Sequence, residues 1–264
     1  MKKQILSALG SHPWAEALLW YDTIDSTNTK AKLLAAQGAP SGTVLVADQQ
    51  TGGRGRMGRS FHSPSGTGIY LSAILRPQCK PSEIMHLTCA VAVAMCDAIQ
   101  TACGIRPGVK WINDLILQQK KVGGILTEMA LNGDGTVQYA VVGIGINCTQ
   151  NAEDFPPELQ DIAISLEQVL QVPVSRPELV AEIVRALSQM SDDLQKKKYL
   201  LLDTYRSDCV TIGKDVMVHS PTGDLQGRAL DVDSDGALVV RFEGGSIRAI
   251  QSGEVSVRGL SGYC

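Results

Sequence analysis

The sequence predicts an α+β protein in which a central mixed β-sheet with flanking helices spans residues 1–210 and a small all-β barrel spans residues 213–264. Three observations support this. Two long segments, residues 81–103 and 176–198, carry apolar residues at helical spacing. Several short apolar runs between them have strand character. From Gly213 onward, short strands are separated by turn signals, which is typical of a small barrel.

The composition is that of a folded protein with no bias toward a polyanionic partner. The chain has 264 residues, of which 44% are hydrophobic and 19% charged, with a formal net charge of −3. Such values lie far from those of disordered chains. A net negative charge gives no reason to expect binding to nucleic acid, so any basic site must be local.

The cysteines and the N-terminus indicate a cytoplasmic location. Of the seven cysteines, Cys89, Cys96 and Cys103 recur every seven residues, which predicts one core-facing stripe on a helix in a reducing compartment. No C-x-x-C pair or zinc-type spacing is present. The N-terminal segment MKKQILSALGSHPW contains too few consecutive apolar residues for a signal peptide. The sequence has no run of 18 apolar residues, so no membrane span is predicted.

The first predicted elements flank a loop rich in glycine and arginine. The segment DTIDSTNTKAKLLAAQG predicts a helix that is capped by one of residues 25–28 and stopped by Gly38. Residues 43–48, TVLVAD, predict a strand that leads directly into the loop. Residues 68–77, GIYLSAILRP, predict a second strand that follows it.

The middle of the sequence predicts a buried helix, three strand-like runs and a second helix. The helix begins near Pro81 and stops at Gly104. The strand-like runs are GVKWIND with LIL, VGGILTEMA, and VQYAVVGIGINC. The turn LNGDGT at residues 131–136 predicts a hairpin between the last two runs, because Asn-Gly and Asp-Gly tolerate positive φ. An amphipathic helix with a lysine-rich end is expected over residues 176–198.

The barrel is predicted from five short strand-like runs, GKDVMVHS, LQGRALDVD, GALVVRF, SIRAI and EVSVRG. Pro-Thr-Gly, Asp-Ser-Asp-Gly and Glu-Gly-Gly supply turn signals between them. The region carries five Lys/Arg against seven Asp/Glu, so its charge does not favour binding to nucleic acid.

The loop QQTGGRGRMGR, residues 49–59, raises three possibilities. Its glycines allow close backbone approach, and Arg54, Arg56 and Arg59 supply guanidinium groups, so it can form a clamp for phosphate or a carboxyl-phosphate anhydride. It can equally be a solvated loop without a ligand, or an RNA-binding box. The third possibility is the weakest, because such boxes have longer repeats with interleaved aromatic residues.

A second cluster of charged residues lies in VKWINDLILQQKKVGGILTEM. Asn113 and Asp114 are expected at the end of one strand and Lys121 at the start of the next, before Gly124. A carboxylate and an amide are suitable Mg²⁺ ligands, and nearby lysines can neutralise phosphates. The alternative is a turn whose lysines form a solvated flank.

Two further motifs are less specific. DSTN at residues 25–28 places hydroxyl and amide groups at a helix start, where they cap the helix or bind a polar ring or carboxylate. GIGIN at residues 143–147 is no dinucleotide fingerprint, because no helix with the third glycine follows it.

The order of these motifs is more specific than any one of them. DSTN, QTGGRGRMGRSFHSPSGTGIYLS, VKWINDLIL, KKVGGILTE and VVGIGIN occur in succession over residues 20–150. The whole run closely resembles the biotin–protein ligase, or biotin–[acetyl-CoA-carboxylase] ligase, family. The C-terminal barrel is similar to the SH3-like domain of that family.

The resemblance implies that the protein joins biotin to ATP with Mg²⁺, making biotinyl-5′-AMP, and passes the biotinyl group to a lysine of a biotin carboxyl carrier protein. The implied catalytic residues are Lys121, Arg56 and Asp114, the last linked to Mg²⁺. The implied biotin and biotinyl-AMP contacts are Ser26, Thr27, Asn28, Gln50, Gly53, Arg54, Gly55, Arg56, Lys121 and Gly124. The implied ATP or adenine contacts are Phe61, Lys110, Asn113 and Asn147.

The sequence departs from the family pattern at two positions. Ile112 stands where KWPND has proline, and Phe61 stands where a tryptophan is expected near the adenine. Only about 20 residues precede DSTN, too few for a DNA-binding domain, so we expect no repressor role. A monomer or weak homodimer is expected. The nearest alternative, lipoate–protein ligase, lacks the GRGRxGR loop.

Overall fold

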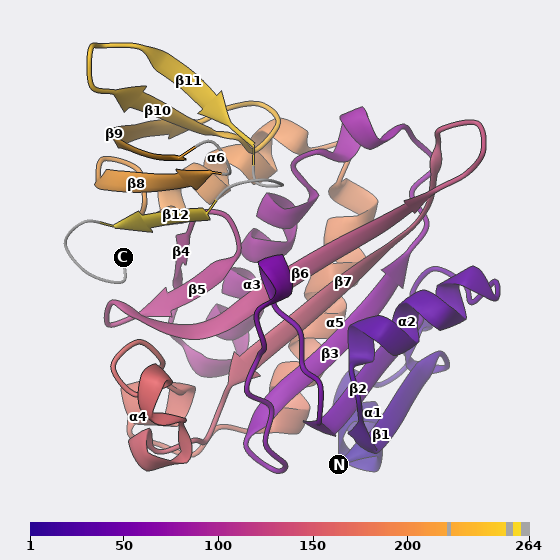
Figure 1. Cartoon of the computed structure of the whole chain (residues 1–264). Coiled ribbons are helices and arrows are strands. Elements are labelled where there is room, and N and C mark those ends of the chain that lie inside the picture. The colour runs from indigo at the N-terminus through magenta and orange to yellow at the C-terminus, as the bar shows by residue number, and fades with distance from the viewer. Residues whose placement is uncertain (221–222, 252–255, 260–264) are drawn as a thin grey trace.

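The computed structural model describes residues 1–220 and 223–251 and the backbone of residues 256–259, and it confirms an α+β fold with two sheets (Figure 1). The α-helices are α1 Lys2–Leu9, α2 Thr27–Ala36, α3 Leu87–Cys103, α4 Leu166–Leu170, α5 Arg176–Asp193 and α6 Lys198–Asp208. The strands of the large sheet are β1 Leu18–Ile24, β2 Val44–Gln50, β3 Gly68–Leu75, β4 Gly108–Lys110, β5 Asp114–Leu117, β6 Lys120–Leu131 and β7 Val137–Asn147. The strands of the small sheet are β8 Asp215–Ser220, β9 Gly223–Val232, β10 Leu238–Phe242, β11 Ile247–Ile250 and β12 Ser256–Gly259. Short 3₁₀ helices are η1 Pro13–Ala15, η2 Arg56–Gly58, η3 Pro81–Ile84, η4 Ala152–Asp154 and η5 Pro157–Leu159.

The large sheet is mixed, with strand order β1-β2-β3-β7-β6-β5-β4. Only β1 and β2 run parallel, and the other neighbouring pairs are antiparallel. The predicted hairpin at residues 131–136 is confirmed, because β6 and β7 pair along most of their length on either side of it. These two long strands form the centre of the sheet.

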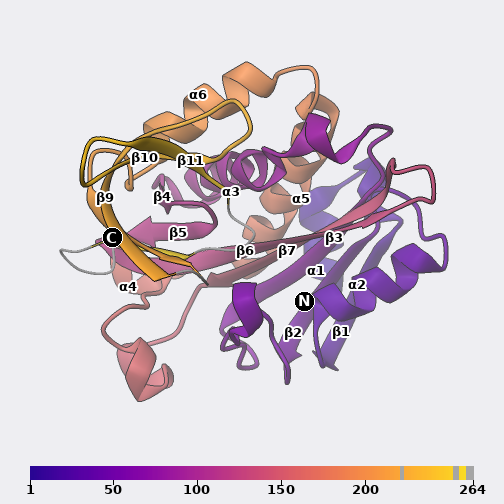
Figure 2. The ribbon, with the colours of Figure 1, turned by 45° about the horizontal axis from the view of Figure 1, so that its top comes forward.

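The helices cover the two faces of this sheet unequally. Successive strand residues point to opposite faces. In β2, Val44 and Val46 therefore belong to the main core with α3 and α5, whereas Leu45 belongs to a small cluster with Ala31 and Ala35 of α2. Figure 2 shows α3 and α5 on one side of the sheet and α2 on the other. The face beside α2 is thus left partly uncovered.

The predicted helix over residues 81–103 is divided in the structure. The 3₁₀ turn η3 precedes α3, which begins at Leu87 and ends where Gly104 adopts the left-handed conformation. Pro81–Cys103 is long and apolar enough to cross a membrane by length and composition, with 72% of its most apolar window buried. Its Leu87–Ile99 portion packs into the main core with α5, which is the environment of a core helix.

Several element predictions were incomplete or wrong at their boundaries. The run from Gly108 forms two strands, β4 and β5, which pair as a tight hairpin, so Asp114 begins a strand rather than ending one. The helix predicted over residues 176–198 ends at Asp193, and its expected lysine-rich end leads into α6. The elements α1, β1, α4 and α6 had not been predicted.

The small sheet has the five predicted strands in antiparallel order β11-β10-β9-β8-β12. In the described part of the chain, β11 and β12 are its two edges, and no pairing between them closes a barrel. The Pro-Thr-Gly turn signal falls partly, and Cys264 wholly, outside the described residues. The division into residues 1–210 and 213–264 stays a prediction.

The six cysteines of the described residues are free thiols. Cys89 and Cys96 are fully buried on α3, whereas Cys103 is half-buried at its last turn. Burial raises the pKa of the Cys89 and Cys96 thiols, and it raises that of Cys148 to about 12. These groups are packed as small apolar side chains.

Candidate active site

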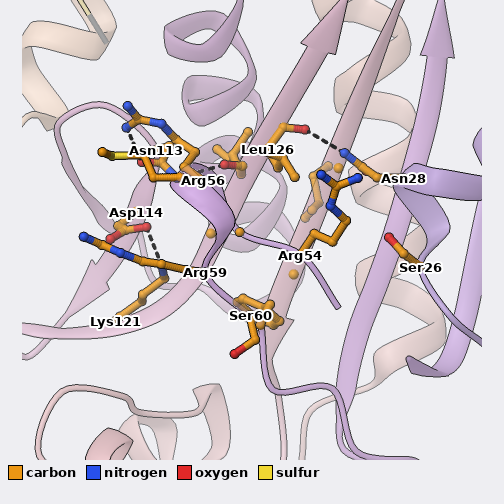
Figure 3. A pocket seen from close by; sticks show the side chains of 18 of the residues that line it. Ser26, Asn28, Arg54, Arg56, Arg59, Ser60, Asn113, Asp114, Lys121 and Leu126 are labelled. Atoms are coloured by element: carbon orange, nitrogen blue, oxygen red, sulfur yellow. Dashed lines mark hydrogen bonds and ion pairs between the residues drawn. The ribbon is translucent and has the colours of Figure 1, made fainter. Parts of the chain in front are cut away.

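A cavity of about 570 Å³ lies where the three predicted motifs meet. Figure 3 shows side chains from the start of α2, the arginine loop, the β4–β5 corner and β6 around it. The predicted site residues that line it are Ser26, Thr27, Asn28, Gln50, Arg54, Gly55, Arg56, Phe61, Lys110, Asn113, Asp114, Lys121 and Gly124. The fold therefore brings together motifs that are up to about 100 residues apart.

Parallel pairing explains why the first two motifs are neighbours. Ile24 at the end of β1 is aligned with Gln50 at the end of β2, so both strands deliver their following residues to the same edge of the sheet. Ser26 then caps α2, with its Oγ accepting from Thr29 N at 3.4 Å. The amide of Thr27 donates to Gln50 Oε1 at 2.9 Å, and the Thr27 hydroxyl oxygen lies 3.0 Å from the same atom.

The arginine loop forms a small ribbon over the cavity. Arg54 and Ser60 form an antiparallel bridge, and Gly55 N donates to Arg59 O at 2.7 Å. Figure 1 shows this ribbon crossing in front of β6 and β7. The Arg56 guanidinium donates to Asn113 Oδ1 at 3.1 Å, so the loop is fastened to the β4–β5 corner. Burial lowers the pKa of Arg56, and the nearby carboxylate of Asp114 opposes that shift.

Asp114 and Lys121 form an ion pair at the end of the cavity that lies opposite Ser26 and Asn28 (Figure 3). Their Oδ1 and Nζ atoms are 2.5 Å apart on the neighbouring strands β5 and β6 (Figure 3). Asp114 faces Gly124 across this pairing. A Cβ at Gly124 would lie 3.1 Å from Lys121 Nζ, so the glycine leaves room for the lysine chain to lie along the strand.

The GIGIN motif has a role that sequence reasoning missed. Gly143 and Gly145 both line the cavity, since alternate residues of β7 share a face. A Cβ at Gly143 would lie 2.0 Å from Asn28 Oδ1, and one at Gly145 would lie 2.5 Å from Phe61 Cε1. The two glycines therefore form a floor on which those side chains rest. Their spacing of two within a strand was the available signal.

Two of the predicted site residues are not among those that line the cavity. Gly53 O accepts from Phe61 N at 2.9 Å, and a Cβ there would lie 2.4 Å from Phe61 O. Gly53 therefore supports the base of the loop. Asn147 is buried and donates through Nδ2 to Ile164 O at 3.2 Å and to Lys121 O at 3.4 Å, so it braces the backbone beneath Lys121.

Other residues that line the cavity were not selected from the sequence. They are Met57, Ser60, Trp111, Ile125, Leu126, Gly143, Ile144, Gly145, Leu159 and Ile162. Half of them are apolar or glycine residues of β6 and β7, which look like ordinary core positions in a sequence. Arg59, which the sequence did indicate, also lines the cavity. Leu159 and Ile162 come from the segment after β7, where no pattern indicates a site.

The β4–β5 corner is held in place by the C-terminal part of the chain. Trp111 Nε1 donates to Gly236 O in the β9–β10 turn at 3.0 Å, and Trp111 N donates to Thr211 Oγ1 at 2.9 Å. The hydroxyl of Tyr205, on α6, donates to Ile112 O at 3.2 Å. One wall of the cavity therefore depends on contacts with α6 and the small sheet.

The side chains around Asp114 could hold a metal ion that is also bound by a ligand, but they do not form a site in which protein side chains alone surround the metal. In the described part of the chain, no group of three or more His, Cys, Asp or Glu side chains could hold a metal ion. Mg²⁺ is typically held by one or two carboxylates together with substrate phosphates and water. A single carboxylate beside a cationic cavity fits that arrangement.

Comparison with known proteins agrees with this geometry. The model of the Biotin/lipoate A/B protein ligase family matches residues 20–147, and that of the Biotin protein ligase C terminal domain matches residues 211–258. The first match covers every residue that lines the cavity except Leu159 and Ile162, and the second covers nearly all of the small sheet.

Individual relatives extend the match to nearly the whole chain. The bifunctional ligase/repressor BirA of Bacillus subtilis is 35% identical over 260 residues, which cover 97% of this chain and 78% of that protein. The biotin–[acetyl-CoA-carboxylase] ligase of Mycobacterium tuberculosis is 32% identical, covering 87% and 85%. The structure of biotin protein ligase from Aquifex aeolicus in complex with biotin and ATP superposes with a TM-score of 0.77 at 30% identity, covering 92% of this chain and 98% of that one. The chain therefore belongs to the biotin protein ligase family.

Proposed function

We propose that this protein activates biotin with ATP as biotinyl-5′-AMP and transfers the biotinyl group to a lysine of the carboxyl carrier protein of acetyl-CoA carboxylase. The observation that carries the proposal is the convergence of the DSTN helix start, the arginine loop and the Asp114–Lys121 pair on one cavity of about 570 Å³. That arrangement offers polar groups for a ring at one end and charged groups for phosphates at the other.

The first step joins two anions, so charge must be offset. A carboxylate oxygen of biotin attacks the α-phosphorus of ATP, and the bond to the pyrophosphate oxygen breaks. Lys121 and Arg56 are placed to stabilise the negative charge that develops on the phosphoryl oxygens. Mg²⁺, with Asp114 as its protein ligand, would neutralise the phosphates and the leaving pyrophosphate.

The second step needs a cavity that excludes water and admits the acceptor amine. The acceptor lysine amine attacks the biotinyl carbonyl, AMP leaves with the electrons of the carbonyl–oxygen bond, and the nitrogen loses a proton. The mixed anhydride would hydrolyse in open water, so the ribbon over the cavity protects it. We propose that this ribbon opens and closes as a lid.

The individual site assignments follow the same division. We assign Ser26, Thr27, Asn28 and Gln50 to the biotin end of the cavity, with Arg54, Gly55 and Gly124 along the biotin tail. Phe61, Lys110 and Asn113 are assigned to the ATP end. Gly53 and Asn147 act by supporting Phe61 and Lys121 rather than by contact.

Exchange of labelled pyrophosphate into ATP tests the reaction. The full-length protein should catalyse exchange in the presence of biotin and no exchange with lipoate. Lipoate is the informative competitor, because one family model covers both kinds of ligase. Exchange with lipoate and not with biotin would replace this proposal by lipoate ligation. Transfer is then checked by labelling a purified carboxyl carrier domain.

A further inference from the structure

Asn28 uses its amide entirely within the protein. Its Nδ2 donates to Leu126 O at 3.3 Å, a bond drawn in Figure 3, and to Glu128 Oε2 at 3.0 Å. Its Oδ1 accepts from Ser72 Oγ at 2.6 Å. Both amide hydrogens are therefore taken, and the side chain rests against Gly143. Asn28 has no donor left for a ligand.

Ser72 connects Asn28 to groups that face the cavity. The Ser72 hydroxyl lies 2.8 Å from Thr27 Oγ1 as well as 2.6 Å from Asn28 Oδ1. Because Asn28 Oδ1 takes the single hydroxyl proton of Ser72, Ser72 Oγ can only accept at its other contact, from the hydroxyl of Thr27. The Thr27 amide donates to Gln50 Oε1 at 2.9 Å. The orientation of the Asn28 amide thus fixes the directions of the Ser72 and Thr27 hydroxyls.

Glu128, on β6, determines that orientation. Its Oε2 accepts from Asn28, and its Oε1 pairs with Lys32 Nζ at 2.6 Å. Burial alone would raise the pKa of Glu128, but the hydrogen bonds from Lys32 and Asn28 outweigh it and keep the carboxylate ionised. A carboxylate offers two acceptors and no donor, so only the nitrogen of Asn28 can face it.

We propose that Glu128, held by Lys32, is a positioning residue for the biotin end of the cavity. It acts through Asn28 and Ser72 on the Thr27 hydroxyl, which lines the cavity, and it does not contact the ligand itself. The inference rests on the proposed function, because it assigns these groups to biotin. Without the acceptor at Glu128, only the longer bond to Leu126 O holds the Asn28 nitrogen, so the flipped amide becomes accessible and the Ser72 and Thr27 hydroxyls lose their fixed donor directions.

Glu128→Gln is the main test, because a carboxamide keeps the shape but has one acceptor for two donors. In pyrophosphate exchange with the full-length protein, KM for biotin should rise about tenfold, since a partly buried hydrogen bond to a charged group is lost. KM for ATP and kcat should change less than twofold. A general loss of structure would instead alter all three quantities and the melting temperature.

Two further variants separate orientation from charge. Lys32→Met leaves Glu128 able to accept from Asn28, so it should raise KM for biotin less than threefold. In the double variant Glu128→Gln with Lys32→Met, the carboxamide oxygen is free to turn to Asn28, and most of the biotin affinity should return. Glu182→Gln on α5, which breaks a pair with Arg185 far from the cavity, is the matched control and should behave as wild type.

The outcomes distinguish the inference from the proposed function. If wild type and Glu182→Gln are active and Glu128→Gln has an unchanged KM for biotin, the inference is wrong and the proposed function stands. If wild type shows no exchange with biotin, the proposed function fails. In that case the role of Glu128 is tested by the hydrogen–deuterium exchange rate of the Asn28 side-chain amide. This rate should be higher in Glu128→Gln than in wild type, and equal rates would overturn the inference.

Discussion

At the scale of single residues, small differences in shape decide what the cavity can hold. Gly143 and Gly145 matter because a Cβ would displace Asn28 or Phe61. Lys121 matters because it is placed beside Asp114 by the register of β5 and β6.

Lys121→Ala should reduce biotin-dependent pyrophosphate exchange by about 10²–10³-fold, the usual effect of removing one contact that stabilises transition-state charge. The melting temperature should stay close to wild type, because the side chain is only partly buried. Lys120→Ala is the matched control, since Lys120 donates to Gln160 O outside the cavity. Equal exchange rates in folded Lys121→Ala and wild type would remove the catalytic assignment.

Gly143→Ala should destabilise the protein by about 1–3 kcal/mol, because the new methyl group overlaps Asn28 in a packed site. Denaturant unfolding measures this. Gly133→Ala in the β6–β7 hairpin is the control, since a Cβ there meets no atom within 4 Å. If both variants had the same stability, the close packing of Asn28 on β7 would be contradicted.

Asp48 should contribute a pH-dependent part of the stability. Burial would raise its pKa, but hydrogen bonds from Ser65, Arg176 and the amide of Gly66 outweigh it and lower the pKa below its usual 3.8. A lowered native pKa stabilises the fold above pH 3.8, and this contribution is lost as the pH falls further through the native pKa. The melting-temperature difference between wild type and Asp48→Asn should therefore be constant above about pH 5 and shrink below about pH 4. A constant difference down to pH 3 would argue against this.

At the scale of elements, the loop between β2 and β3 is the segment whose chemistry was most ambiguous in the sequence. In the structure it is a ribbon fastened at Arg54–Ser60 and by Arg56 to Asn113. Its glycines serve close backbone contacts, and its three arginines line the cavity, with Arg56 partly buried and Arg54 and Arg59 also exposed to solvent. A solvated, unattached arginine loop does not agree with these contacts.

Arg56→Ala should loosen this ribbon and let the adenylate escape. We expect about tenfold faster release of biotinyl-5′-AMP, because a hydrogen bond from a charged group to Asn113 and the charge over the cavity are both lost. Release is measured by rapid filtration with labelled biotin, and labelling of bystander lysines should rise. If release were unchanged, the loop would not act as a lid.

At the scale of the whole molecule, the small sheet contributes to one wall of the cavity. Trp111 lines the cavity and donates to Gly236 O in the β9–β10 turn. Gly236 lies close to Cys89 of α3, since a Cβ there would be 2.9 Å from its Sγ. The small sheet is therefore docked on the helices that support the catalytic face.

Trp111→Phe should leave Gly236 O unpaired in a buried contact and cost about 1–3 kcal/mol of stability. Hydrogen exchange in the turn at residues 233–237 should become faster. Trp20→Phe is the control, because the indole of Trp20 bonds Asp22 at the exposed surface. If exchange in the turn were the same in all three proteins, the small sheet would not be held through Trp111.

The sequence by itself determined the type of most elements, the family resemblance and most of the residues that line the cavity. Those features depend on local spacing: a capped helix start, glycines beside arginines, and Lys-x-x-Gly at a strand. Only the tertiary structure decided which motifs share a site. Ile24 and Gln50 are neighbours through parallel pairing, and Asp114 meets Lys121 through the β5–β6 register. It also decided that Asn28 is fully bonded within the protein and that Gly143 supports it. The Asn28 contacts join residues about 44 to 115 positions apart, and no local pattern specifies which strand will face which.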